Sequence, residues 1–382
     1  MKDCFKAIRR WISTLIMIVF RVCPINPRKV VFSSYFSTAL NDNPWEIFQA
    51  MRRVHPEFTY IWLLRKPQSV EGGRSVKADT VAALYHLATA KCWIDNSRKR
   101  SWVVKRKGQF YMQTWHGSIP FKHVEADVAD KLPELYVKSA KRDSKMADIF
   151  ISGSRWATNR YKRCFWYDGE IWECGLPRSD VFYKAPQETR EKVDAWLGGN
   201  ADTHYILYAP TFRVDDSLDY YLKDYTQLLK SITDRCGGDW RILVRLHPRI
   251  AEKHGFIDYD EQVIDASYYP NINELIIRSD IMISDYSSCM FDAMEARKNV
   301  FLYMPDLEAY MADRGCEFEL AELPFPICRD EKALCSALAE ADFAALNKKA
   351  ETFMNKCGIC NGPDSSDKVA TYLFQKMAAN KR

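Results

Sequence analysis

The chain contains 382 residues, of which 47% are hydrophobic and 27% are charged, and its formal net charge is +5 at pH 7. This composition is typical of a globular protein with a sizeable core, and no internal repeat or low-complexity segment interrupts it. The length exceeds that of one ordinary domain and favours two domains of about 150 to 200 residues each. The mild net charge does not indicate a nucleic-acid partner, and we expect none.

Residues 1–25 predict a basic amphipathic helix that associates with a membrane surface. Apolar side chains recur through the segment, and lysines and arginines flank them. The longest uncharged run, Trp11 to Phe20, is about half of the roughly 20 residues that a spanning helix requires. No small-residue cleavage site follows, so we expect no removable signal peptide. A basic helix with Trp and aliphatic residues suits an anionic membrane interface, although such a helix can also bury its apolar face against protein.

Two short basic runs follow, Arg98-Lys99-Arg100 and Lys105-Arg106-Lys107. They could face lipid headgroups or a polyanionic acceptor, but a solvated surface is the more common role of such runs.

Two histidines follow apolar, strand-like runs. Phe110 to Met112 lead into the segment Gln113-Thr-Trp-His-Gly-Ser118, and Trp240 to Val244 lead into Arg245-Leu-His-Pro248. The carboxyl ends of strands are where ligands bind in open α/β sheets. A lone histidine is more often structural, but Gly117 allows close backbone approach beside His116. Arg245 lies on the same face of the strand as His247, and this pairing of guanidinium with imidazole favours a phosphate ligand.

Three further strand-like runs end in hydroxyl or cationic side chains: Glu173 to Asp180, Ile206 to Arg213, and Ile281 to Asp292. In the last of these, Ser287 and Ser288 come where a buried strand gives way to a helix. Free backbone N–H groups and the helix dipole make such a position an anion site. Each run alone could be a simple turn or an ordinary Ser cap, but five such strand ends together favour one binding site.

These segments together resemble the CDP-glycerol glycerophosphotransferase family, the teichoic-acid primases and polymerases of bacterial envelope synthesis. The resemblance extends from about residue 28 over nearly the whole chain. It rests on Gln113-Thr-Trp-His-Gly117 with Lys122, Gly175-Leu-Pro-Arg178, Tyr208-Ala-Pro-Thr-Phe-Arg213, Arg245-Leu-His-Pro248 and Ser284-Asp-Tyr-Ser-Ser-Cys-Met-Phe-Asp292, with Val31-Phe32 to Asn43-Pro44 and Asp306 to Tyr310 in addition. Two positions depart from the family pattern, because Ser179 stands where Asn is common and Glu125 where Gly is common.

The resemblance implies an α/β fold with two Rossmann-like lobes of the glycosyltransferase-B type. The polar stretch 187–203 is the expected lobe boundary. We therefore expect a membrane-association helix at 1–25, an N-terminal acceptor-side lobe at 26–195, and a C-terminal CDP-polyol-binding lobe at 196–382.

The implied reaction is attack by an acceptor hydroxyl on a CDP-activated polyol, which transfers polyol phosphate and releases CMP. His116 is the expected base, and His247 could protonate the departing phosphate. Arg245, Ser287 and Ser288 would stabilise the leaving group. The remaining expected substrate contacts are Gly117, Ser118, Ile119, Pro120, Arg178, Pro210, Thr211 and Asp292. Asp285 is expected to brace its turn, and Lys122, Asp127, Arg213 and Tyr286 are secondary candidates.

We expect no cofactor and no metal ion. Cys357-Gly-Ile-Cys360 has metal-ligand spacing without a second pair, and Asp258-Tyr-Asp260 lies in a polar stretch outside the five segments. The twelve cysteines are scattered, so reduced thiols are expected.

The expected partners are a CDP-glycerol or CDP-ribitol donor, a lipid-linked or polymeric acceptor, and the cytoplasmic face of the cell membrane as a peripheral location. A primase, a short-chain transferase and a polymerase all fit. Two other classes stay open: a glycosyltransferase of the same fold that uses a nucleotide sugar, and a non-catalytic scaffold for envelope assembly.

Overall fold

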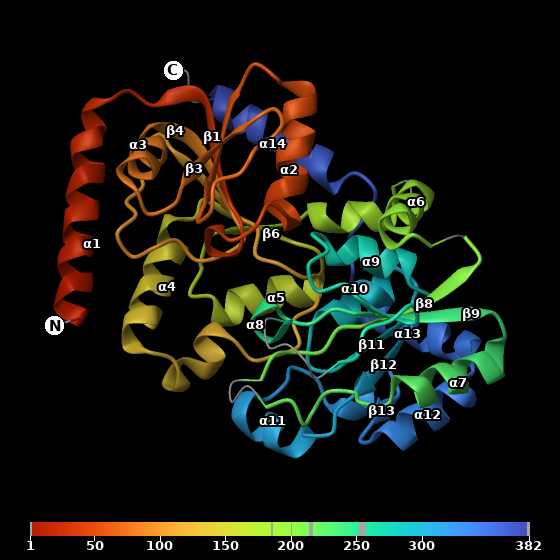
Figure 1. The fold of residues 1–382 in the computed structure, drawn as a ribbon. Helices are drawn as coiled ribbons and strands as arrows, with labels where there is room; N and C mark the ends of the chain where they lie inside the picture. The colour runs from red at the N-terminus through yellow and green to blue at the C-terminus, as the bar shows by residue number, and fades with distance from the viewer. Residues whose placement is uncertain (1, 185, 200, 214–216, 252–256, 380–382) are drawn as a thin grey trace. The chain divides into compact units, whose positions relative to one another are not determined.

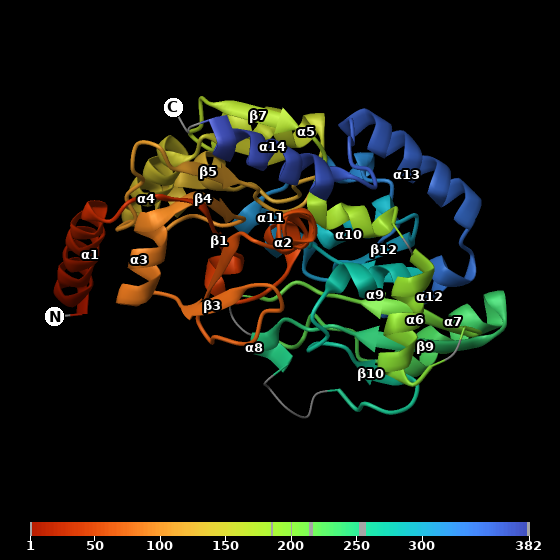
Figure 2. The same cartoon turned by 90° about the horizontal axis from the view of Figure 1, so that it is seen from above.

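The computed structural model describes residues 2–184, 186–199, 201–213, 217–251 and 257–379. The chain forms two compact units. The first contains Met1–Ser118, Val124–Asp180 and Cys360–Arg382, and the second contains Ile119–His123 and Val181–Ile359. Each unit is built on a parallel sheet with helices packed against it (Figures 1 and 2). The predicted α/β class with parallel sheets is therefore confirmed.

The first unit has a sheet of seven parallel strands in the order β3-β2-β1-β4-β5-β6-β7. Its central strands β1 and β4 are buried along most of their length, because helices cover both faces of the sheet. Strands buried on both faces do not need alternating polar and apolar residues. The strand order reverses between β1 and β4, which makes the carboxyl ends of these two strands the topological switch point. The strands are β1 Asn26–Ser33, β2 Thr59–Leu64, β3 Arg74–Lys77, β4 Ala90–Asp95, β5 Phe110–Gln113, β6 Ile149–Ser152 and β7 Glu170–Glu173.

Helices of the first unit pack on the sheet through two apolar clusters. One cluster joins the strands to α2 and to α14, which comes from the far end of the chain. The other joins them to α3 and α1. The helices are α1 Lys2–Val19, α2 Asp42–Val54, α3 Val81–Thr89, α4 Glu134–Met146, α5 Arg155–Cys164 and α14 Ser365–Ala379, with short 3-10 segments at Phe20–Val22, Tyr35–Ser37, Glu125–Lys131 and Pro177–Phe182. Thr80 and Ser154 cap α3 and α5 by accepting hydrogen bonds from backbone N–H groups of the first turn.

Within the N-terminal segment, residues Lys2–Val19 form helix α1, beside α3 in Figure 1. One side of α1 packs on the unit, where Met17 is 1% exposed and the ring of Phe20 lies edge-on to Tyr85, with 5.4 Å between ring centroids. The opposite side carries a stripe of exposed apolar side chains: Ile8, Trp11, Ile12, Leu15, Ile18 and Val19. Among the described residues, no helix is long and apolar enough to cross a membrane.

Two of the three residues in the first predicted basic run, Arg98 and Lys99, are buried, and only Arg100 is exposed. Arg98 is buried and forms ion pairs with Glu125 at 3.0 Å and Asp143 at 3.2 Å. Lys99 is buried and pairs with Asp95 at 2.8 Å. A buried charge needs such partners because desolvation would otherwise be very costly.

The second basic run is also engaged by the protein. Lys105 pairs with Asp148 at 2.5 Å, and Arg106 donates hydrogen bonds to the carbonyl oxygens of Cys23 and Ala88. Arg98, Lys99, Lys105 and Arg106 thus stabilise the first unit, whereas Arg100 and Lys107 are exposed.

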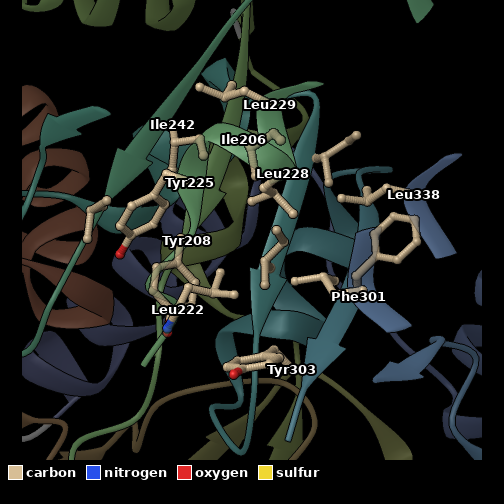
Figure 3. Close-up of a cluster of buried hydrophobic side chains, with 14 of the residues drawn as sticks. Ile206, Tyr208, Leu222, Tyr225, Leu228, Leu229, Ile242, Phe301, Tyr303 and Leu338 are labelled. Carbon is tan, nitrogen blue, oxygen red and sulfur yellow. The ribbon is translucent and has the colours of Figure 1, made fainter. Parts of the chain in front are cut away.

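The second unit has a sheet of six parallel strands in the order β10-β9-β8-β11-β12-β13, with its switch point between β8 and β11. The strands are β8 Thr203–Tyr208, β9 Asp239–Val244, β10 Val263–Asp265, β11 Ile281–Ser284, β12 Asn299–Tyr303 and β13 Ile327–Cys328. The helices are α6 Pro186–Leu197, α7 Tyr225–Cys236, α8 Pro248–Ala251, α9 Ile272–Arg278, α10 Cys289–Glu295, α11 Leu307–Arg314, α12 Glu331–Ala339 and α13 Phe343–Cys357, with a 3-10 turn at Leu320–Glu322. Figure 3 shows the core in which α7 and α12 pack on this sheet.

The boundary between the units differs from the predicted one. The stretch 187–203 is not a linker, because most of it forms α6, which is held within the second unit by an ion pair from Asp194 to Arg278 at 2.5 Å. The predicted C-terminal lobe also loses residues 360–382 to the first unit, where α14 completes an apolar cluster. Residues 1–25 belong to the first unit as well.

Candidate active site

His116 lies in the loop after β5, at the carboxyl edge of the first sheet. Trp115 with φ 46° and Gly117 with φ 82° both adopt left-handed backbone, so the chain turns sharply on either side of the histidine. The imidazole is half-buried and stacks on the Trp115 ring with centroids 4.8 Å apart. Its Nδ1 lies 3.1 Å from the carbonyl oxygen of Asn96, which follows β4. A carbonyl only accepts, so Nδ1 carries the proton and the neutral ring holds its lone pair on Nε2.

The surroundings of His116 favour this neutral form. Burial lowers the pKa of His116, and the Arg178 guanidinium adds to the lowering, while the Asp42 carboxylate and the hydrogen bond to Asn96 oppose it. The net effect is a pKa below the ordinary value of 6.5. At neutral pH the imidazole is therefore available to take a proton.

Arg178 is buried and already has a carboxylate partner. Its Nε lies 3.0 Å from Oδ2 of Asp42, and the Tyr35 hydroxyl donates to the same oxygen at 2.8 Å. The backbone N–H of Arg178 donates to Oδ1 of Asn43. A substrate phosphate would therefore compete with Asp42 for the Arg178 guanidinium.

Ser118 is buried, and its polar groups are bound within the first unit. Its hydroxyl accepts a hydrogen bond from Nδ2 of Asn361 at 2.5 Å, and its carbonyl accepts from the Ser154 hydroxyl at 2.5 Å. The structure thus brings His116, Gly117, Ser118 and Arg178 together at one edge of the first sheet. The sequence analysis missed Asn361. This residue also donates to the Ser179 hydroxyl, and the two positions are 182 residues apart, so no local sequence pattern indicates the contact.

A second group of candidate residues surrounds the switch point of the second sheet. Asp285, after β11, accepts hydrogen bonds from the Thr211 N–H at 2.8 and 2.9 Å and from the Tyr286 N–H at 2.6 Å. Arg213 pairs with Asp285 at 2.9 Å and with Asp306 at 2.7 Å. The expectation that Asp285 braces its turn is confirmed, and Arg213 takes part in the same bracing.

Arg245 differs from Arg213 in its partners. Its guanidinium donates to the carbonyl oxygens of Ala266 at 3.1 Å and Tyr269 at 2.6 Å. Within the described ranges, no carboxylate lies at ion-pairing distance, and burial lowers the pKa of Arg245. A cation in this setting lacks counter-charge, which a bound phosphate would supply.

Further predicted residues also belong to the second unit. Thr211 Oγ1 is buried and makes no hydrogen bond to any residue in the described part of the chain. Ser287 accepts from the Cys289 N–H at 3.4 Å, and Ser288 occupies the N-cap of α10, as the sequence predicted. The others are Pro210, half-buried; Asp292, buried in α10; Ile119, buried; Pro120, half-buried; and His247, exposed with its ring 5.4 Å from that of Phe212.

The two departures from the family pattern have local explanations. Glu125 adopts φ 57°, the left-handed backbone in which glycine is favoured, and its carboxylate pairs with Arg98. Ser179 is buried, and its hydroxyl accepts from Asn361 at 3.2 Å. Both side chains therefore serve the folded structure.

Potential metal ligands do not gather into a site in the part of the chain that the structure describes, where no group of three or more His, Cys, Asp or Glu side chains could hold an ion. Asp260 accepts hydrogen bonds from the N–H groups of Gln262 and Val263, so it stabilises a turn.

Comparison with known proteins assigns the chain to a family. The family model for CDP-glycerol:poly(glycerophosphate) glycerophosphotransferase matches residues 15–375. The chain belongs to this family. A teichoic acid poly(glycerol phosphate) polymerase of Staphylococcus epidermidis is 30% identical over 89% of the chain, and the match covers 50% of that protein. A polymerase of the same name from Bacillus spizizenii is 28% identical over 94% of the chain and 95% of its own length.

A solved member of this glycerophosphotransferase group has the same fold. The wall teichoic acid polymerase TagF, in a crystal soaked with CDPG, superposes with a TM-score of 0.87 at 25% identity, over 100% of this chain and 98% of the TagF chain. The chain spans about half the length of the Staphylococcus epidermidis relative.

Proposed function

We propose that the protein transfers polyol phosphate, with glycerol phosphate as the first candidate, from a CDP-polyol to a hydroxyl of a lipid-linked or polymeric envelope acceptor, with release of CMP. Family membership supports the reaction class. The observation that carries the proposal is His116 at the carboxyl edge of the first sheet, in the loop after β5, with Nδ1 bound to the carbonyl oxygen of Asn96, the Nε2 lone pair available and a lowered pKa. We also assign the two units to the halves of a glycosyltransferase-B type fold.

In the proposed reaction, the acceptor oxygen bonds to the phosphorus next to the polyol, and the bond from that phosphorus to the CMP oxygen breaks. The acceptor proton passes to Nε2 of His116. CMP departs with increased negative charge, which needs preorganised positive groups. Arg245 is the first candidate because it is a buried cation, and Ser287, Ser288 and Thr211 offer hydroxyl groups to the phosphate oxygens. His247, which is exposed, could protonate the leaving phosphate.

The same proposal gives the first unit the acceptor side and the second unit the donor side. Gly117, Arg178, Pro210 and Asp292 stay predicted contacts. To bind a phosphate, the Arg178 guanidinium would have to give up its ion pair with Asp42. The donor is CDP-glycerol or CDP-ribitol.

We further propose that the enzyme works at the cytoplasmic face of the membrane as a peripheral protein. The support is the outward side of α1, where Trp11 is 78% and Leu15 61% exposed. Apolar side chains on a helix that also carries Arg9 and Arg10 suit the interface of an anionic bilayer.

The proposal is tested by mixing the purified protein with CDP-glycerol, and separately with CDP-ribitol, together with a membrane extract as source of acceptor, and measuring CMP. We expect release with one donor, and a loss of about 10²- to 10⁴-fold in kcat for His116→Ala. His204→Ala is the matched control, because His204 is exposed and lies on β8.

Release of a nucleoside diphosphate from a nucleotide sugar would instead favour the glycosyltransferase alternative. A folded protein that binds neither CDP-polyol nor nucleotide sugar would favour a scaffold. CMP release that survives in His116→Ala would keep the reaction class and contradict the base assignment.

A further inference from the structure

Two buried or half-buried asparagine side chains connect the same two loops of the first unit. One loop, Thr114–Ser118, carries His116, and the other, Gly175–Asp180, carries Arg178. Asn43 is fully buried at the start of α2, donates from Nδ2 to the Trp115 carbonyl at 3.0 Å, and accepts from the Arg178 N–H at 3.0 Å.

Asn361 makes an equivalent bridge from the C-terminal segment. Its Nδ2 donates to the Ser118 hydroxyl at 2.5 Å and to the Ser179 hydroxyl at 3.2 Å. Its Oδ1 accepts from the Leu176 N–H at 2.7 Å. Each amide therefore satisfies a group of the His116 loop with its donor and a backbone N–H of the Arg178 loop with its acceptor.

The space around Asn361 is fitted to this side chain. A Cβ placed on Gly153 would lie 2.6 Å from Oδ1 of Asn361, 2.6 Å from the Ser118 hydroxyl and 2.9 Å from Leu176 Cγ. Such distances are well inside van der Waals contact, so any larger residue at 153 would displace the amide or the loops. Asp180 fixes the end of the Arg178 loop by accepting from the N–H groups of Ser365 and Ser366, at the start of α14.

From these contacts we propose that Asn43 and Asn361 are positioning residues, which hold the His116 loop and the Arg178 loop in one arrangement. This inference rests on the proposed function for its catalytic consequence. At position 43 the side chain needs both a donor and an acceptor, because it bridges the Trp115 carbonyl oxygen and the Arg178 N–H. At position 361 the amide donates to two hydroxyl oxygens and accepts from the Leu176 N–H. The His116 ring follows the Trp115 backbone and side chain, so a shift of the Trp115 carbonyl moves Nε2.

The test replaces each amide by its near-isosteric acid, Asn43→Asp and Asn361→Asp. An ionised carboxylate has no donor. In Asn43→Asp it would face the Trp115 carbonyl oxygen, and in Asn361→Asp it could bind the Ser118 hydroxyl only as an acceptor. We expect kcat for CMP release to fall about 10- to 100-fold, as small misplacements of a catalytic group do, with a much smaller change in the KM of the CDP-polyol. Asn159→Asp, the same change at an exposed position of α5, is the control and should leave both constants unchanged.

A readout independent of activity is the NMR resonance of the His116 Cε1–H, assigned by its absence in His116→Gln. The stacked Trp115 ring makes this resonance sensitive to ring placement. It should move in both variants and stay in place in Asn159→Asp. Asn43 is buried, so Asn43→Asp could fail to fold. In that case the same resonance is measured in Asn361→Asp, at a half-buried position, and in Gly153→Ala, whose added methyl group would displace the Asn361 amide.

The outcomes separate the two proposals. A moved resonance in a protein that releases no CMP even as wild type would uphold the positioning role and reject the proposed function. An unmoved resonance with unchanged kcat in folded Asn361→Asp and Gly153→Ala would overturn the positioning role, whatever the wild-type activity.

Discussion

Burial and two opposite charges act on His116, and burial, the largest effect, sets the direction in which its pKa moves. Burial and Arg178 lower its pKa, whereas Asp42 raises it. The unprotonated ring is the proposed base, so kcat/KM should rise with pH through the pKa of His116 and level off near neutrality.

The first prediction concerns this pH profile. We expect its acidic limb to have a midpoint below 6.5, and Asp42→Asn to move that midpoint to lower pH, because the carboxylate that favours imidazolium is gone. The measurement is kcat/KM for CMP release between about pH 4 and 8. Asp79→Asn, which removes a carboxylate paired with Arg100, should leave the midpoint in place. A midpoint that rises in Asp42→Asn would contradict the electrostatic account.

The second prediction separates a bracing arginine from a ligand-binding one. Arg213→Ala leaves Asp285 and Asp306 without their cation, and should lower the free energy of unfolding by about 3–5 kcal/mol. Arg245→Ala removes a buried charge that has only carbonyl partners, so its stability loss should be smaller while the KM of the CDP-polyol rises. Urea denaturation and CMP-release kinetics check the two effects. Arg241→Ala, on the same strand β9, is the kinetic control.

Residues at strand ends could be predicted from the sequence, and residues that support them could not. His116, Arg245 and Ser288 stand next to apolar runs, which is a local signal. The partners Asn43 and Asn361 are distant in sequence from the loops that they bridge, and asparagine is common in turns for unrelated reasons. The ion pairs of Arg98 were hidden for the same reason, since Glu125 and Asp143 come from other segments. Lys99 pairs with Asp95 only four residues away, but the cluster of basic residues did not indicate that pair.

Among the elements, α1 was predicted either to lie on a membrane or to pack against protein, and the helix packs one side on the first unit and exposes the other. Met17 packs in the first unit while Trp11 is exposed. Periodicity gave the helix and its apolar content, but it could not assign which apolar residues meet protein, because that depends on the position of α3 and the sheet.

The third prediction tests the outward side of α1. Replacement of Trp11 and Leu15 by Ser should abolish most binding to vesicles that contain anionic lipid, and should leave the melting temperature nearly unchanged because both side chains are exposed. Sedimentation with anionic and with zwitterionic vesicles measures the effect, and raised salt should weaken wild-type binding.

Trp196→Ser provides the control for this experiment, since Trp196 is also an exposed tryptophan but lies on α6. Equal vesicle binding by wild type and by the α1 variant would show that another surface carries the association.

For the whole molecule, the number of units and their parallel sheets could be predicted from length and from alternating strands and helices. The division of the chain could not. A polar stretch at 187–203 has the composition of a linker, yet α6 packs against α9 through Asp194 and Arg278. The return of α14 to the first unit leaves no mark on the local sequence, because its apolar stripe would suit either core.

The fourth prediction follows from that return. Leu373 is fully buried in the first core, so Leu373→Ala should lower the free energy of unfolding by about 2–5 kcal/mol. Exchange of backbone amide hydrogens should accelerate in β1 and β4 of the first sheet and stay unchanged in β8 and β11 of the second sheet. This pattern is expected because Leu373 packs in the first unit, even though it follows the second unit in sequence. Gln375→Ala, an exposed change on the same helix, should affect neither sheet. Faster exchange confined to the second sheet would contradict the assignment of α14.

The discontinuous first unit also sets an order of events during synthesis. All of Val181–Ile359 must leave the ribosome before residues 360–379 can complete the first core and bring Asn361 to the His116 loop. The second unit is nearly continuous and can fold while the chain is still growing. A nascent chain therefore gains the proposed donor-side unit first, and the loop that carries its proposed base is fixed only after residues 360–379 have emerged.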